Sequence, residues 1–197
     1  MKLGFVIFEG MTTLDFMGVY DPVTRLKTMG FLPDLRWEVC ALSSEVADIT
    51  GLRLLPTRVG GSLHDFDMVI VPGGRGSRTL MHDPEFLEWL RSARPCRYKV
   101  SVCAGALLLG AAGFLVGKRA TTHPNAFKEL EPFCASVVED RVVDEGNVIT
   151  ARGVTAAIDL GLYLCEKLAG LEVKERIRRQ MDYEGAAGTV RGGRTGG

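Results

Sequence analysis

Hydrophobic residues along this chain gather in short runs, which alternate with segments of helical periodicity. Runs rich in β-branched and aromatic residues are typical of buried strands. The strands predicted in this way cover residues 2–8, 35–42, 68–72, 99–102, 118–122, 137–138, 141–143 and 147–151, and a short hairpin is expected around Gly51. These runs indicate that the centre of the molecule is a sheet.

Apolar positions at helical spacing predict helices between these strands. The predicted helices cover residues 14–27, 84–93, the segment after Cys103, 123–130, 156–169 and 171–183. Thr12 or Thr13 is expected to cap the first helix, and Pro22 is expected to kink or split it. Alternating strands and helices predict an α/β fold with a mainly parallel sheet and helices on both faces.

Composition and charge narrow the function classes. The chain has 197 residues, 46% of them hydrophobic, which fits a single domain with a substantial core. Basic and acidic residues number 24 each, so charge gives no argument for a nucleic-acid or membrane partner. The first apolar run is too short for a signal segment, so a cytoplasmic location is expected.

The five cysteines do not form the pattern of a disulfide framework or a metal site. Their number is odd and no C-x-x-C pair occurs. The Gly-rich turn after residue 72 also lacks the phosphate-loop and dinucleotide patterns. We therefore predict no metal and no cofactor, and a reducing compartment.

Cys103 stands out because it lies where a predicted strand meets a helix of small residues. Ala104, Gly105 and Ala106 follow it, so little side-chain bulk hides the sulfur. A nucleophile at such a sharp turn has the geometry of a nucleophile elbow. A buried, inert thiol is the alternative, and this stretch alone does not decide between the two.

Possible partners of Cys103 lie at the ends of other predicted elements. Asp15 falls in the first turn of the helix after the first strand, where ligands bind in parallel sheets, although a helix-dipole role is an equal alternative. The N–H groups of Gly74 and Ala104 are candidate oxyanion donors. His123 follows a strand end and is either an accessory catalytic group or a capping residue; His64 and His82 are expected at the surface.

Several motifs together resemble the DJ-1/PfpI superfamily, whose fold is class I glutamine amidotransferase-like. They are Gly-Phe-Val-Ile-Phe at 4–8, Leu14-Asp15 with Asp21, Val71-Pro72-Gly73-Gly74, Ser101-Val102-Cys103-Ala104-Gly105-Ala106, Ala120-Thr121-Thr122-His123 and the segment 150–159. The resemblance implies a single-domain flavodoxin-like sandwich over residues 1–184. From Gly185 the chain is rich in Gly, Thr and Arg and poor in apolar residues, which predicts a flexible Gly-rich tail at 185–197. The resemblance also implies a homodimer and a small-molecule substrate.

Within that superfamily the motifs are most similar to the isocyanide hydratase branch. The resemblance implies that Cys103 attacks the isocyanide carbon, that Asp15 acts as acid and base, and that the product is an N-formamide. Ala104 departs from the threonine usual there. A glyoxalase or deglycase acting on reactive carbonyls and a non-enzymatic redox sensor or chaperone therefore stay open as alternatives, whereas a peptidase is disfavoured.

Overall fold

The computed structural model describes residues 1–185, and its centre is a seven-stranded sheet. In spatial order the strands are β10 Val142–Asp144, β11 Val148–Ala151, β7 Tyr98–Val102, β6 Met68–Val71, β1 Lys2–Val6, β2 Arg36–Ala41 and β5 Arg58–Val59. All neighbouring pairs are parallel except β10 with β11. The predicted mainly parallel sheet is confirmed.

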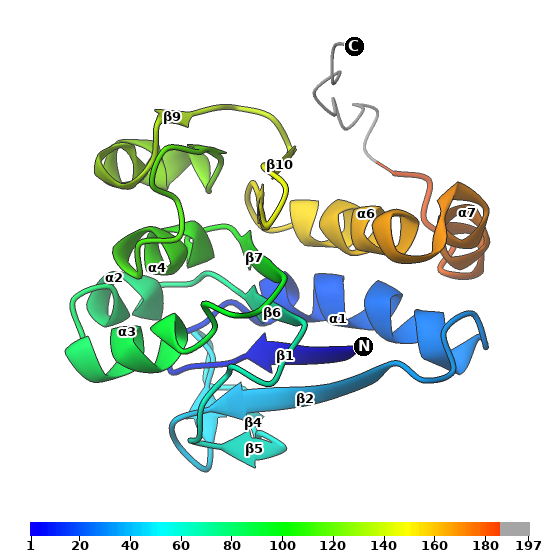
Figure 1. Cartoon of the computed structure of the whole chain (residues 1–197), viewed down its shortest axis with the longest axis horizontal. Helices are drawn as coiled ribbons and strands as arrows, with labels where there is room; N and C mark the ends of the chain where they lie inside the picture. The colour runs from blue at the N-terminus through cyan, green and yellow to red at the C-terminus, as the bar shows by residue number, and fades with distance from the viewer. Residues whose placement is uncertain (186–197) are drawn as a thin grey trace.

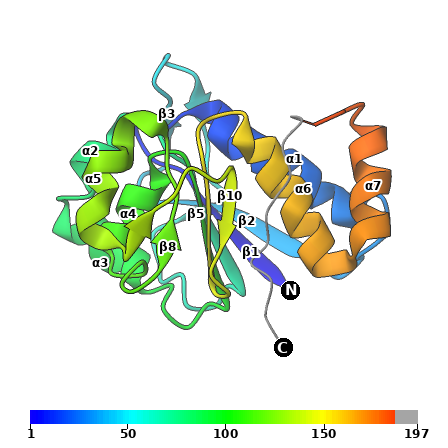
Figure 2. The ribbon, with the colours of Figure 1, turned by 90° about the horizontal axis from the view of Figure 1, so that it is seen from above.

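Helices cover both faces of this sheet, as Figures 1 and 2 show. One layer contains α1 Thr13–Thr28, α6 Ala156–Ala169 and α7 Leu171–Gln180, and the other contains α2 Gly76–Leu80, α3 Pro84–Arg91, α4 Gly105–Ala111 and α5 Phe127–Leu130. Two small ribbons, β3 Val46–Ala47 with β4 Arg53–Leu54 and β8 Arg119–Ala120 with β9 Ser136–Val137, and the 3-10 turns Pro124–Ala126 and Glu131–Phe133 complete the fold. The predicted sandwich is thereby confirmed.

The three central strands form the most deeply buried part of the molecule. Phe5 on β1, Val69 on β6 and Val100 on β7 have no exposed surface. Burying a side chain of this kind contributes about 1.5–3 kcal/mol. The loops that follow these strands therefore start from a rigid base.

Helices α1 and α6 pack closely because small residues lie at their crossing. A Cβ atom at Gly18 would lie 2.6 Å from the Ala157 side chain, and one at Gly161 would lie 2.3 Å from Pro22. The expected split of α1 at Pro22 is wrong, since α1 is one helix of 16 residues, while the expected kink stays a prediction. The notch at Gly161 leaves room for the proline ring.

Other differences from the predicted elements are local. Thr12 is the residue before α1, but no side-chain cap is formed, and the Thr13 hydroxyl instead donates to Asp48 Oδ2 at 2.7 Å. The helix predicted at 123–130 is a 3-10 turn followed by a short helix. Helix α2 was not predicted, because its sequence Gly-Ser-Arg-Thr-Leu has no apolar periodicity.

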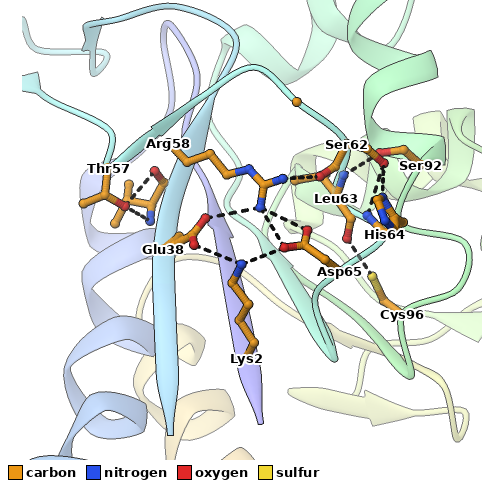
Figure 3. Close-up of polar contacts among 12 residues, drawn as sticks. Lys2, Glu38, Thr57, Arg58, Ser62, Leu63, His64, Asp65, Ser92 and Cys96 are labelled. Atoms are coloured by element: carbon orange, nitrogen blue, oxygen red, sulfur yellow. Dashed lines mark hydrogen bonds and ion pairs between the residues drawn. The ribbon is translucent and has the colours of Figure 1, made fainter.

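The edge strand β5 was also missed, and a charged cluster holds it against the sheet (Figure 3). Lys2 Nζ lies 3.0 Å from Glu38 and 2.6 Å from Asp65, while Arg58 lies 3.2 Å and 3.0 Å from the same two carboxylates. These groups are partly exposed, so each ion pair alone contributes little to stability. The four groups act together as a network. Two residues of strand are too few to leave a hydrophobic pattern.

None of the helices formed by residues 1–185 combines the length and the apolar character needed to cross a bilayer. The predicted Gly-rich tail at 185–197 lies outside the described residues except for Gly185. The boundary at residue 184 therefore stays a prediction.

Candidate active site

The candidate site lies at the carboxyl ends of three adjacent central strands. Cys103 follows β7, Gly73 follows β6, and Asp15 lies in the first turn of α1, the helix after β1. Open parallel α/β sheets bind ligands at this edge. The strand order therefore brings together residues that are far apart in the sequence.

Cys103 forms a strained turn between β7 and α4. Its φ is 55°, in the left-handed region that non-glycine residues rarely adopt. Strain of this kind costs about 1–3 kcal/mol and is typical of functional sites. Its N–H donates to the carbonyls of Ala151 and Arg152 at 3.0 and 3.1 Å, and its carbonyl accepts from the Thr122 hydroxyl at 2.7 Å. Hydrogen bonds therefore fix both the N–H and the carbonyl group of Cys103.

Gly73 is the point where the parts of the site meet. A Cβ atom there would lie 2.5 Å from Ala104 N, 2.8 Å from Cys103 Cβ and 2.9 Å from Asp15 Oδ2. No side chain fits into that space without displacing all three groups. Glycine at this position thus allows the thiol and the carboxyl to approach each other.

Asp15 is fully buried, unlike an ordinary acidic residue in the first turn of a helix. Its Oδ2 accepts a hydrogen bond from Gly73 N at 3.0 Å, while Oδ1 has no hydrogen-bond partner of its own among the described residues. Burial raises the pKa of Asp15 to about 7, and hydrogen bonds from Gly73 and Cys103 oppose that rise. Near neutral pH this carboxyl can either accept or donate a proton.

The Cys103 thiol is less acidic than an ordinary cysteine thiol. Burial, followed by the charge of Asp15, raises its pKa to about 12. The Ala104 N–H and Arg78 lower it, so the helix start acts in the expected direction but is outweighed. In the resting site the proton stays on sulfur while the neighbouring carboxyl ionises.

A cavity of about 220 Å³ gives access to Cys103. Besides Cys103, its lining residues include Gly74, Arg78, Ala104 and His123. Arg78 is held in the wall by Glu129, at 2.6 Å. The cavity size fits a small molecule rather than a folded peptide segment.

His123 lies in this cavity wall, yet it is not paired with the thiol. Its Nδ1 accepts from Asn125 N at 3.2 Å, which places the proton of a neutral ring on Nε2. Within residues 1–185 the hydrogen bonds include none between His123 and Cys103. His123 caps the turn Pro124–Ala126 and also lines the cavity, so its capping role is observed and an accessory catalytic role stays a prediction.

The structure brings Cys103, Asp15, Gly74, Ala104 and His123 into one region, whereas His64 and His82 are exposed, as predicted. Sequence reasoning missed Thr122 and took Gly73 only for a turn residue. The chain offers one signal for Gly73, the doubled glycine directly after a buried strand. Across the described residues, no three His, Cys, Asp or Glu side chains converge as metal ligands would.

Comparison with known proteins shows which proteins this chain is similar to. Isonitrile hydratase of Pseudomonas putida is 39% identical over 189 residues, which cover 93% of this chain and 78% of that protein. Protein DJ-1alpha of Drosophila melanogaster is 28% identical, covering 89% of this chain and 81% of its own length. A ThiJ/PfpI family protein from Pseudomonas syringae has a crystal structure that matches with a TM-score of 0.85 and 31% identity, over 98% of this chain and 78% of that chain.

The DJ-1beta structure of Drosophila melanogaster matches with a TM-score of 0.81 at 24% identity, over 93% of this chain and 98% of that chain, and shows the shared fold. The model of the DJ-1/PfpI family matches residues 1–167. The predicted resemblance is therefore confirmed, and this chain belongs to the DJ-1/PfpI family.

Proposed function

We propose that this protein hydrates isocyanides to N-formamides, with Cys103 as the nucleophile and Asp15 as the acid and base. The observation that carries the proposal is the fully buried Asp15 carboxyl, held by Gly73 beside the Cys103 thiol. A group whose pKa is about 7 is well matched to moving protons at neutral pH. The similarity to isonitrile hydratase points to the same reaction.

In the first step, a bond forms between Cys103 Sγ and the isocyanide carbon. The thiol proton passes to the Asp15 carboxylate and from there to the same carbon, which gives a thioimidate, R–N=CH–S–Cys103. Asp15 suits this transfer because its pKa lies between that of a normal carboxyl and that of the thiol. The Ala104 N–H stabilises the negative charge that develops on sulfur.

In the second step, water adds to the thioimidate carbon. One water proton goes to the nitrogen, and the remaining hydroxyl proton passes through Asp15 to sulfur as the carbon–sulfur bond breaks. The products are R–NH–CHO and the free thiol, so no external oxidant or reductant is consumed. Gly74 and Ala104 are proposed to orient the intermediate from the cavity wall.

The test is formamide production from phenyl isocyanide, followed by chromatography. We expect turnover by the native protein and none above background for Cys103→Ala. A matched variant, Cys134→Ala, removes a partly buried thiol outside the cavity and is expected to keep full activity. Absence of turnover by the native protein would contradict the proposal.

A second candidate substrate class is reactive carbonyls of the methylglyoxal type. It is favoured by His123, whose Nε2–H in the cavity wall is a donor suited to a carbonyl oxygen. In that case the native protein forms lactate from methylglyoxal, and His123→Phe abolishes it. Isocyanide hydration needs no such donor, so His123→Phe distinguishes the two chemistries.

A redox role of Cys103 stays a prediction beside these reactions. Thiols oxidise in proportion to their thiolate character and exposure, and Cys103 combines access from the cavity with a proton acceptor in Asp15. Mild peroxide is expected to give sulfinate confined to Cys103, read by peptide mass spectrometry. Equal oxidation of all five cysteines would exclude this role.

We further propose that the protein acts as a homodimer. Supporting this, apolar side chains are exposed beside the site: Leu14 and Met17 on α1 are 44% and 41% exposed, and Ile49 on the neighbouring hairpin is 46% exposed. The hairpin is joined to the start of α1 by the bond from Ile49 N to Met11 O at 3.0 Å. Light scattering should give twice the chain mass, and Met17→Arg should reduce it to the monomer mass.

A further inference from the structure

A second cavity adjoins the one that contains Cys103. Its volume is about 410 Å³, and it shares two lining residues, His123 and Val154, with the first. The two cavities therefore adjoin each other at His123 and Val154. The proposed reaction uses only the cavity that contains Cys103.

Two arginines line the second cavity, and each also has a carboxylate partner: Asp159 for Arg141 and Glu139 for Arg152. Arg141 and Arg152 both line it, and no carboxylate is among its described lining residues, which are His123, Pro124, Arg141, Arg152, Gly153, Val154 and Thr155. The last three residues lead directly into α6, a helix of 14 residues whose amino end carries partial positive charge. The two guanidinium groups and the amino end of α6 therefore favour an anionic group.

The two guanidinium groups are fixed, but neither is saturated. Arg141 is paired with Asp159, and its Nη2 donates to Thr155 Oγ1 at 3.1 Å. Arg152 Nη1 donates to the Glu139 carbonyl at 3.0 Å and lies 4.0 Å from the exposed Glu139 carboxylate. Its guanidinium lies 5.4 Å from the Phe127 ring centroid. Arg141 Nη1 and Arg152 Nη2 make no hydrogen bond with the described residues. A held guanidinium with a free edge suits a carboxylate.

The His123 ring sits at the passage between the cavities for a structural reason. A Cβ atom at Gly153 would lie 2.3 Å from His123 Cδ2, so the ring packs directly on the backbone that precedes α6. This packing and the bond from Asn125 N fix the imidazole as a shared wall. A substrate that occupied both cavities would therefore lie beside this ring.

We propose that the second cavity is a subsite for a carboxylate on the part of the substrate remote from the reacting carbon, with Arg152 and Arg141 as its ligands. This inference rests on the proposed isocyanide hydration and adds the substrate class, an isocyanide that carries a carboxylate. A carboxylate bound by an arginine edge gains a charge-assisted pair of hydrogen bonds that a neutral group cannot form.

The test compares 4-isocyanobenzoate with the neutral 4-methylphenyl isocyanide. We expect Arg152→Gln to lower kcat/KM for the carboxylate about tenfold or more, and to change it less than about twofold for the neutral substrate. Arg152→Lys should lower kcat/KM for the carboxylate less than Arg152→Gln does, because lysine keeps the charge but lacks the planar guanidinium. Arg119→Gln, which removes an equal charge from the Glu145 pair outside both cavities, should leave both substrates unaffected.

A second measurement does not depend on turnover. The formamide 4-formamidobenzoate is expected to slow alkylation of Cys103 by iodoacetamide in the native protein, and to lose this protection in Arg152→Gln. Equal effects of Arg152→Gln on both substrates, or equal protection in both proteins, would overturn the subsite. Protection by 4-formamidobenzoate without any isocyanide turnover would keep the subsite and refute only the hydration reaction.

Discussion

Cys103 and Cys165 are the same residue in two very different surroundings. Both thiols are buried, and burial raises the pKa of each to about 12. Cys165 lies inside α6 and donates to the Pro22 carbonyl of α1 at 3.2 Å, so it fills the contact between two helices. Cys103 lies at a strained turn, faces a cavity and has a carboxyl beside it.

The comparison teaches that the acidity of the thiol alone does not mark the reactive cysteine. Two features separate the sites: access from a cavity, and a proton acceptor whose pKa is about 7. Asp15 provides this acceptor only because burial raises its pKa, which costs stability. The molecule thus tolerates an unfavourable carboxyl at the place where a proton must move.

The largest expected difference in activity is between two variants that each lack one of these thiols. Cys103→Ala should lower formamide production by at least about 10³-fold, since the covalent step is lost. Cys165→Ala should leave activity within about twofold and lower the free energy of unfolding by about 1 kcal/mol, because it leaves a small cavity. Equal loss of activity in both variants would remove the distinction between the two regions.

Asp15→Asn is expected to reduce activity by about 10²–10⁴-fold, because the amide still accepts from Gly73 N but cannot carry the proton. The measurement is kcat for isocyanide hydration. Activity near that of the native protein would show that Cys103 works without a proton acceptor at this position.

The same variant should be more stable than the native protein at pH 8. The pKa of Asp15 is about 7 in the folded protein, above the ordinary value of 3.8, so the folded state binds the proton more tightly than the unfolded state does. Native stability therefore falls as pH rises from about 4 to 7, by up to roughly 4 kcal/mol. Urea unfolding across this range should show that slope in the native protein and a smaller one in Asp15→Asn.

A smaller effect is expected at Thr122, whose hydroxyl holds the Cys103 carbonyl. Thr122→Val keeps the shape and removes this bond, so we expect activity to fall about tenfold and stability by about 1–2 kcal/mol. Thr24→Val is a matched control, because Thr24 is also buried and donates to a main-chain carbonyl, that of Asp21, far from the site. If both variants lose activity equally, the bond at the elbow has no special role.

The sequence predicted the elements of the fold that are long enough to show a hydrophobic pattern. Helix α6 has the bounds that apolar periodicity predicted. The turn at Cys103 lies between the predicted strand and the predicted helix of small residues. The lack of pattern in β5 and α2 explains why they were missed, since two and five residues carry too little periodicity.

The sequence predicted which residues form the site, but it did not predict their pKa values or the contacts that hold them. Asp15 and Cys103 follow strand ends, which the sheet order brings together. The direction of the thiol pKa was not readable, because it depends on how deeply both groups are buried. Gly73 and Thr122 act through contacts with residues distant in the sequence, and only the folded chain reveals those contacts.

The proposed mechanism requires Asp15 to take the proton of Cys103, and the pH dependence of Cys103 alkylation tests this directly. The rate with iodoacetamide is measured by peptide mass spectrometry from pH 5 to 9, in the native protein and in Asp15→Asn. Asp15 is ionised above its pKa of about 7, so the native rate should rise with a midpoint near pH 7, while Asp15→Asn should show no step there. Identical pH profiles in the two proteins would contradict the account.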